Sequence, residues 1–210
     1  MNLTRIIMVD DHNVVREAIA TVINNFPGCQ VLFQASNGRE LIKYLNPDKP
    51  PEIVLLDLQM PVMDGFETAK WLKENYPTVR VLVLSMYTSE LARIRLLKMG
   101  VRGILAKDIH PSELKTAIET TMTTGYYYSG QTTTTLASLL TSGEISLSAN
   151  EMRLLELVCS ELTYKEIAIK MGVSPRTIDN YRDTLFSKLN VKSRAGLILV
   201  AMRNGLIKPD

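Results

Sequence analysis

The sequence predicts two domains of different fold class. Residues 1–124 are expected to form a five-stranded, doubly wound parallel α/β sheet, and residues 146–210 an all-α domain of four helices. Two observations carry this prediction. Apolar strand-like runs alternate with helix-like spacing five times before residue 125, and only helix-like patterns follow Ser146. Between them, residues 125–145 hold glycines, tyrosines and a run of four threonines, which is typical of a linker.

Short apolar runs mark the strands of the first domain. The run Ile53–Leu56 does not alternate between apolar and polar residues, so it is expected to be buried on both faces of a parallel sheet. The five predicted strands cover 5–9, 29–35, 53–57, 81–84 and 103–106, and the five predicted helices cover 13–26, 38–44, 64–76, 88–99 and 111–124.

The predicted linker has two local features. The tyrosines at 126–128 resemble a stacking platform, but packing where the fifth helix meets the linker is the favoured interpretation. Residues 136–140 are expected to form one short helix.

Capping signals define the second domain. Ser148 with Glu151, and Thr163 with Glu166, each fit the Ser/Thr-x-x-Glu capping box. Ser174-Pro175 then supplies an N-cap and a first-turn proline for a helix to about residue 189, and a last helix is expected over 193–204. A short helix, a turn containing Gly172 and a longer helix form the helix-turn-helix pattern, whose second helix enters the major groove of DNA.

Composition limits the remaining choices. The chain has 210 residues, two cysteines and 46% hydrophobic residues, and no apolar stretch reaches the roughly 18 residues of a membrane span. The cytosol is therefore the expected location, without a membrane partner. Lys and Arg number 10 against 7 Asp and Glu in residues 146–210, whereas 14 of each balance in residues 1–124. The small excess favours nucleic acid only weakly.

Charged and polar side chains lie at the ends of several predicted strands of the first domain. Asp57 is the last residue of the third strand, and Ser85 and Lys107 directly follow the fourth and fifth strands. The pair Asp10-Asp11 follows the first strand, so all these groups are expected on one edge of the sheet, where open α/β folds build their ligand sites. Clustered carboxylates repel, and Mg²⁺ relieves the repulsion. An aspartate beside the metal can then accept a phosphoryl group. Taken singly, Asp57 is more often a turn cap and Lys107 a solvated side chain.

These motifs resemble the receiver domain of bacterial two-component response regulators, which has a flavodoxin-like fold. The resemblance implies that Asp57 accepts a phosphoryl group from a phosphohistidine of a sensor histidine kinase. It also implies that Mg²⁺ lies among the carboxylates and a main-chain carbonyl, and that a hydroxyl and an ammonium group stabilise the phosphoryl group. The matching residues are Asp10, Asp11 and Asp57 with Gln59 for the metal, and Ser85 and Lys107 for the phosphoryl group.

One position departs from the receiver pattern. Receivers usually carry Tyr or Phe three residues before the lysine, where the ring reorients on phosphorylation, but this chain has Ile104. Tyr87 is expected to serve as the substitute.

The second domain resembles the four-helix DNA-binding domain of the LuxR, or NarL/FixJ, class. Leu147-Ser148-x-x-Glu151 and Leu162–Ala168 match its first two helices, and Val173–Tyr181 matches its recognition helix. Some relatives carry lysine where this chain has Asp179 and Asp183; an acid there weakens phosphate contact but can accept a hydrogen bond from cytosine N4. Asp179 and Asn180 are expected nearest the bases, with several cations nearer phosphates. The predicted DNA-binding residues are Arg176, Thr177, Asp179, Asn180, Arg182, Asp183, Lys188, Lys192 and Arg194.

Three functional classes compete at this point. A phosphorylation-controlled transcription regulator would bind double-stranded promoter DNA, as a homodimer when phosphorylated, and would not be a dedicated enzyme. An aspartyl-phosphate hydrolase would need a second acid two residues beyond its nucleophile, where this chain has Gln59. A binding module without phosphorylation is disfavoured because the acids, Ser85 and Lys107 are all present.

Overall fold

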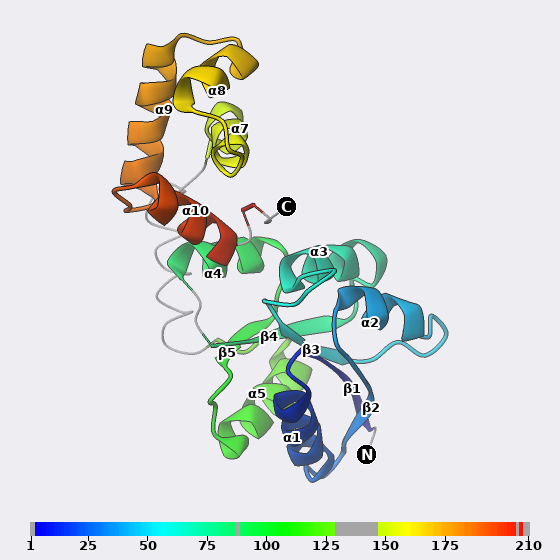
Figure 1. The fold of residues 1–210 in the computed structure, drawn as a ribbon. Coiled ribbons are helices and arrows are strands. Elements are labelled where there is room, and N and C mark those ends of the chain that lie inside the picture. Colours follow the sequence, from blue (N-terminus) through cyan, green and yellow to red (C-terminus); the bar gives the residue numbers. More distant parts are fainter. Residues whose placement is uncertain (1–2, 87–88, 129–146, 205, 208–210) are drawn as a thin grey trace. The chain divides into compact units, whose positions relative to one another are not determined.

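The computed structural model describes residues 3–86, 89–128, 147–204 and 206–207. The chain divides into two compact units, residues 1–140 and 141–210. The first is an α/β sheet and the second is helical in its described part, which confirms the two predicted fold classes and their order (Figure 1). The predicted linker lies largely outside the described residues, and the helix expected over 136–140 lies wholly outside them, so both stay predictions.

The sheet of the first unit has the strand order β2-β1-β3-β4-β5, and every neighbouring pair is parallel. This order places β1 and β3 side by side at the centre of the fold. The strands are β1 (Thr4–Val9), β2 (Cys29–Ala35), β3 (Ile53–Asp57), β4 (Arg80–Ser85) and β5 (Gly103–Ala106).

Helices cover both faces of the sheet, as the strand order requires (Figure 1). Two helices pack on one face around Ile23, Leu114 and Ile118, and three pack on the other around Leu41 and Leu72. The first pair is α1 (Asn13–Asn24) and α5 (Pro111–Thr124); the other three are α2 (Gly38–Tyr44), α3 (Gly65–Asn75) and α4 (Glu90–Lys98).

Burial follows the sequence pattern strand by strand. Every residue of the central strand β3 is buried, in agreement with its unbroken apolar run. The edge strand β2 instead alternates between partly buried and more exposed residues along most of its length. Ile104 of β5 is buried in the core beside α2, α3 and α4, so an aliphatic side chain fills this position.

The loop after β3 is held in place because its far end, at Asp64 and Gly65, lies against the end of that strand. Asp64 caps α3 and forms a capping box with Glu67, and the Gly65 amide donates to the Leu58 carbonyl at 3.0 Å. A Cβ at Gly65 would overlap the main-chain oxygen of Asp57. Glycine is required here because α3 starts against the backbone that carries Asp57.

The tyrosines at 126–128 pack where α5 ends. The Tyr127 amide donates to the Arg102 carbonyl at 2.7 Å, and its side chain packs against the core formed with α1 and α5. The rings of Tyr126 and Tyr128 stack on each other, with centroids 5.2 Å apart. The packing interpretation is therefore confirmed.

The second unit contains four helices in its described part. Both predicted capping boxes are present, and Ser174 caps the third helix with Pro175 at its first position. The helices are α7 (Ala149–Val158), α8 (Tyr164–Met171), α9 (Pro175–Lys188) and α10 (Arg194–Arg203). Its fully buried core includes Leu154, Leu155, Val158, Ile167, Ile178, Leu185, Leu197 and Ala201. No helix in the part of the chain described above is long and apolar enough to cross a membrane.

Two cations of this unit are tied to its interior. The Arg194 guanidinium donates to the main-chain oxygens of Val158, Ser160 and Leu162 at 2.7–3.1 Å. Lys188 Nζ lies 2.8 Å from Glu151 Oε2, a carboxylate whose side chain is only 7% exposed. Burial raises the pKa of Glu151, but the hydrogen bonds from Lys188 and Ser148 outweigh it and lower the pKa below its usual value.

Replacing Gly65 by alanine should destabilise the first unit. The new Cβ would overlap the Asp57 carbonyl, and forcing an extra carbon into packed backbone costs about 2 kcal/mol. Trp71 of α3 is the single tryptophan, so urea unfolding followed by its fluorescence reports on this unit. Gly196→Ala is the control, because its Cβ would meet nothing closer than Ser193 Oγ at 3.2 Å in the second unit. A Trp71 transition that is unchanged in Gly65→Ala would contradict the close approach.

Replacing Arg194 by alanine should destabilise the second unit by about 3 kcal/mol, because three main-chain carbonyls lose charge-assisted hydrogen bonds. Thermal unfolding of the full chain followed by far-ultraviolet circular dichroism measures the loss. Lys192→Ala removes an exposed cation nearby and should leave the transition in place. Equal stability of the two variants would show that the Arg194 contacts contribute little.

Candidate functional site

The carboxyl ends of the strands bring the predicted groups of the first unit together. In the strand register Val9 of β1 is the partner of Leu56 of β3, so the following residues, Asp10 and Asp57, come side by side. Ser85 of β4 is the partner of Ala106 of β5, and Lys107 follows directly. Strand register alone thus gathers two carboxylates, a hydroxyl and an ammonium group on one edge.

A buried lysine joins the two carboxylates. Lys107 Nζ lies 2.9 Å from Asp10 Oδ2 and 2.9 Å from Asp57 Oδ2, and the three side chains are at most 6% exposed. Asp57 Oδ1 accepts a hydrogen bond of 2.8 Å from the Leu58 amide. Lys107 is therefore not a solvated rim residue, and Asp57 is held from two sides.

Burial and ion pairing shift the pKa values of Asp57 and Lys107 in opposite directions. Burial raises the pKa of the Asp57 carboxyl, and the hydrogen bond from Lys107 acts in the opposite direction without cancelling it. Burial lowers the pKa of Lys107, but its hydrogen bonds to Asp57 and Asp10 outweigh this and raise the pKa overall. Lys107 is thus held as a cation at neutral pH.

The acids form a cluster that could hold a divalent metal ion. Asp10, Asp11, His12 and Asp57 each offer a ligand atom, and these atoms lie within 4.8 Å of one another. Three carboxylates beside one lysine leave an excess of negative charge, and oxygen donors suit a hard divalent cation. The donor set therefore fits the metal that the sequence implied.

His12 belongs to this cluster, although it is not among the site residues predicted from the sequence. Its Nδ1 lies 2.8 Å from Asp11 Oδ1 and 3.2 Å from Asp10 Oδ1, and its side chain is 63% exposed. The Asp-Asp-His order in the sequence was the only available signal, and the direction of the ring becomes visible only in the structure.

Three further residues, Gln59, Ser85 and Tyr87, are predicted from the sequence for this site. Ser85 is buried at the end of β4, and its main-chain oxygen accepts from the Lys107 amide at 3.1 Å. Gln59 has an exposed side chain in the loop after β3, so a metal contact through its carbonyl stays a prediction. Tyr87 lies outside the described residues.

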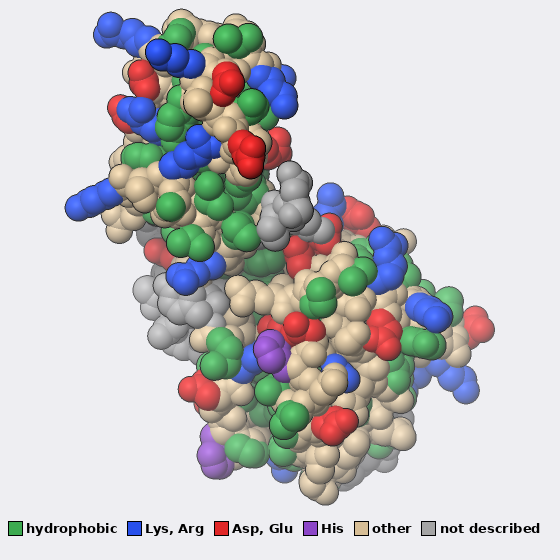
Figure 2. All heavy atoms as spheres, viewed as in Figure 1, with side chains coloured by type: hydrophobic (Ala, Val, Ile, Leu, Met, Phe, Trp, Pro, Cys, Tyr) green, Lys and Arg blue, Asp and Glu red, His purple; other side chains and the backbone are tan. Residues whose placement is uncertain are grey.

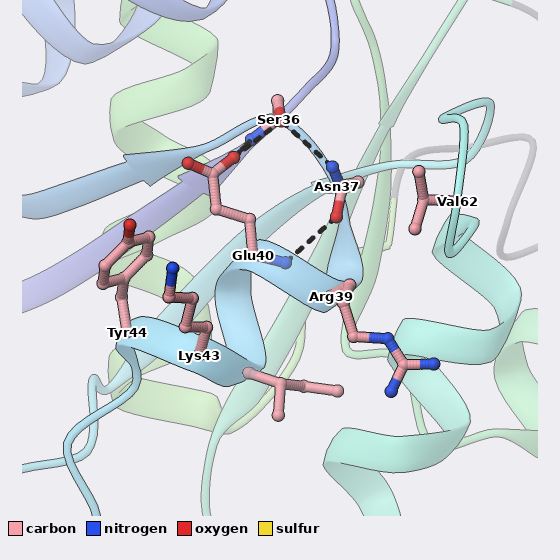
Figure 3. Close-up of a pocket in the computed structure, with 8 residues that line it drawn as sticks. Ser36, Asn37, Arg39, Glu40, Lys43, Tyr44 and Val62 are labelled. Atoms are coloured by element: carbon pink, nitrogen blue, oxygen red, sulfur yellow. Dashed lines mark hydrogen bonds between the residues drawn. The ribbon is translucent and has the colours of Figure 1, made fainter.

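A surface hollow lies along α2, apart from the residues of the acidic cluster (Figure 3). Three of its polar residues bond to one another: Glu40 accepts from the Ser36 amide and hydroxyl, and the Glu40 amide donates to Asn37 Oδ1. The hydrogen bonds from Ser36 lower the pKa of Glu40. These bonds fix the turn between β2 and α2.

In the second unit, α8 and α9 form the helix-turn-helix. Gly172 is the C-cap of α8 in the left-handed conformation with φ of 68°, and Ser174, two residues later, is the N-cap of α9. Ile178 and Leu185 of α9 are buried, so the opposite side of the helix is exposed. The predicted residues on that exposed side are Arg176, Asp179, Asn180 and Asp183.

The remaining predicted DNA-binding residues have different surroundings. Lys192 is exposed, whereas the Thr177 hydroxyl lies 2.8 Å from Ser174 Oγ and belongs to the helix cap. Lys188 and Arg194 make the interior contacts described above, and Arg182 pairs with two carboxylates. On the face seen in Figure 2, acidic and basic side chains intermix over this unit. A contact of these residues with DNA stays a prediction.

Comparison with known proteins agrees with both units. The response regulator receiver domain matches residues 6–119, and the luxR family of bacterial regulatory proteins matches residues 145–201. The response regulator GacA of Pseudomonas protegens is 30% identical over 210 residues, covering 98% of each chain. The response regulator UvrY of Escherichia coli K12 is 26% identical over 220 residues, covering 99% of this chain and 98% of its own.

Solved structures show the same fold. The response regulator ChrA of a heme-sensing two-component system is 27% identical, with a TM-score of 0.54 over 99% of this chain and 100% of its own. RcsB of Salmonella enterica serovar Typhimurium, solved on a promoter with the phosphomimetic BeF3⁻, is 24% identical. Its TM-score is 0.77 over 96% of this chain and 99% of its own. The strand-end cluster, the helix-turn-helix and these matches lead to one conclusion: the chain belongs to the two-component transcriptional response regulators of the NarL/FixJ class, in which a receiver domain precedes a luxR-type DNA-binding domain.

Proposed function

We propose that this regulator is switched by phosphorylation of Asp57, which promotes pairing of two chains on promoter DNA. The receiver domain of the proposal spans residues 1–124, the linker 125–145 and the DNA-binding domain 146–210. The observation that carries it is the contact of buried Lys107 with both Asp57 and Asp10, 2.9 Å each. A lysine that only stabilises the fold does not require two acids at the ends of adjacent strands.

The proposed reaction is phosphoryl transfer from a phosphohistidine of a sensor histidine kinase. An Asp57 carboxylate oxygen attacks phosphorus, a new O–P bond forms, and the N–P bond breaks with its electron pair returning to the imidazole. Lys107 balances the added negative charge, and the Ser85 hydroxyl donates to a phosphoryl oxygen. Asp57 needs no proton removed first, because the reacting form is the carboxylate.

Asp10, Asp11 and Asp57 would hold Mg²⁺, with the Gln59 carbonyl as a further ligand. An ion held there would supply positive charge that neutralises the phosphoryl oxygens. The carboxylates within 4.8 Å of one another support this assignment. His12 beside Asp11 would orient that carboxylate.

We propose no enzyme activity beyond loss of the chain's own phosphoryl group. An aspartyl-phosphate hydrolase would need an acid at position 59, where this chain has an exposed glutamine. The aromatic switch of receivers would fall to Tyr87, because Ile104 is committed to the core.

Dimer formation follows from the small size of the DNA-binding unit. One such unit reaches few phosphates, whereas two linked units bind at high effective concentration and gain avidity without new base contacts. The helical spacing of Leu197, Val200 and Ala201 predicts one interface on the last helix, and the receiver is expected to supply another. Leu197 and Ala201, however, are fully buried in the core. Leu199, 55% exposed, and Met202, 36% exposed, provide the apolar surface instead. RcsB, of the same fold, has been solved as dimers on DNA, which agrees with this proposal.

Asp57 should be the sole phosphoryl acceptor, and labelling should require Mg²⁺. Acetyl phosphate or a cognate kinase should label the wild type stoichiometrically, and Asp57→Ala or excess chelator should abolish the label. Asp48→Ala, at an exposed acid in the loop before β3, should be labelled like the wild type. Stoichiometric acid-stable label on Asp57→Ala would refute the assignment.

DNA binding should require a dimer on two half-sites and should strengthen on phosphorylation. Phosphorylation acts only through different affinities of the two states, so its effect should vanish in Asp57→Ala while basal binding persists. Half-sites should lie about one helical turn apart or less. Sedimentation and footprinting on one selected site measure both properties.

Two substitutions of Leu199 test the proposed interface on α10. Leu199→Glu should weaken binding to the paired site about tenfold or more by removing avidity, whereas Leu199→Met should not. A phosphorylated monomer that protects one half-site with full affinity would rule the mechanism out.

A further inference from the structure

The α9 helix carries a cluster of one cation and two anions beside Tyr164 of α8. Arg182 Nη1 lies 2.8 Å from Asp179 Oδ1, and Arg182 Nη2 lies 2.9 Å from Asp183 Oδ1. Arg182 Nε also donates to Asp183 Oδ1, at 3.1 Å. Asp179 precedes the arginine by one helical turn and Asp183 follows it directly, so a single helix builds the whole cluster.

The guanidinium is held on a third side by an aromatic ring. Its central carbon lies 5.6 Å from the ring centroid of Tyr164, the first residue of α8. The Arg182 side chain is 29% exposed, whereas those of Asp179 and Asp183 are 52% and 67% exposed. Two carboxylates and a ring therefore restrict the rotation of this arginine more than solvent would restrict a free one.

The two aspartates do not use all the N–H donors of the Arg182 guanidinium. A guanidinium has five N–H donors in a fixed plane, and the two carboxylates use one on each of its three nitrogens. One N–H on each terminal nitrogen therefore remains. Two N–H groups of one guanidinium are the donors that bind O6 and N7 of guanine in the major groove.

The charge of the cluster disfavours the phosphate contact expected from the sequence. Two aspartates and one arginine carry a net charge of −1, so a phosphate approaching Arg182 also approaches two carboxylates. A phosphate would have to displace these partners to form its own bidentate pair. A guanine edge is uncharged and meets no such repulsion.

Resting on the proposed DNA-binding function, we propose that Arg182, oriented by Asp179 and Asp183, is a specificity-determining residue that reads guanine in one G·C pair of each half-site. The carboxylates fix the plane of the guanidinium and repel phosphates, so affinity for unrelated sequence stays low. An aspartate beside the arginine can also accept a hydrogen bond from the amino group of a cytosine.

The test uses the full-length chain and a site selected from random double-stranded DNA. Binding is measured on that site, on copies with each G·C pair changed singly, and on unrelated DNA, over a range of salt concentrations. Arg182→Lys keeps the positive charge and removes the planar guanidinium that can donate two hydrogen bonds to one base. It should lose discrimination at one G·C pair per half-site by about 5- to 150-fold, the value of one bidentate contact. Its affinity for unrelated DNA and its salt dependence should stay those of the wild type.

The acids are tested by neutralisation. Asp179→Asn and Asp183→Asn should raise affinity for unrelated DNA and reduce discrimination at the same G·C pair. Glu156→Gln makes the same change of charge at an exposed residue of α7 and should leave discrimination intact. Circular dichroism of each variant confirms the fold, since the cluster is at the surface.

The results that overturn the inference are distinct. Arg182→Lys with wild-type discrimination at every pair shows that the guanidinium reads no base. An Arg182→Ala variant that weakens binding equally on all sequences, with a salt slope lower by about one, identifies a phosphate contact. A wild-type chain that selects no sequence at all refutes the proposed DNA-binding function together with this inference.

Discussion

The receiver unit depends on one interaction, the contact of buried Lys107 with Asp10 and Asp57. Either carboxylate alone at the end of a buried strand would suffer the cost of burial without a partner, and removing one member leaves the others uncompensated. The lysine therefore makes it possible for two acids to stand together on neighbouring strands. Under the proposed function, the same arrangement would prepare a phosphoryl site, because a cation would already be in place where negative charge is added. The stability of the strand ends and the proposed phosphoryl transfer would thus depend on the same three side chains.

Backbone packing determines the position of these side chains. The parallel register sets Asp10 beside Asp57, and the capping box of α3 brings Gly65 against the Asp57 carbonyl. The loop that carries Gln59 is consequently short and anchored at both ends. Leu58, the first residue of this loop, donates its amide to Asp57 Oδ1 at 2.8 Å, so a phosphoryl group on this carboxylate would change a contact of the loop itself. Gly65 is required because a Cβ would overlap the Asp57 backbone, and the strand register determines that Asp10 and Asp57 lie side by side.

Much of this architecture, and part of the two sites, could be predicted from the sequence. Unbroken apolar runs, capping boxes and the Ser-Pro start of α9 are local signals, and each corresponds to an element of the structure. The surroundings of Lys188 and Arg194 could not be predicted, because their partners Glu151 and Val158 lie more than thirty residues away. Their position in or just after the predicted recognition helix suggested phosphate contacts for both. The direction of a long cationic side chain is decided by tertiary contacts, which carry no local sequence signal.

These interior contacts bear on how the regulator can be controlled. Lys188 and Arg194 are used to hold the helical unit together, and Arg182 is paired with two acids, so fewer cations remain for phosphates. Among the described residues after 146, the exposed basic ones are Arg153, Lys165, Lys170, Arg176, Lys192 and Arg203. Not all of these lie on the helix-turn-helix, and each phosphate contact adds only modest, salt-dependent affinity. A single unit is therefore expected to bind weakly, and weak binding is what makes pairing effective as a switch. If one unit bound tightly, a dimer formed on phosphorylation would change occupancy little. The use of Lys188 and Arg194 for packing, and the proposed use of Arg182 for base selection, thus favour control through dimerisation.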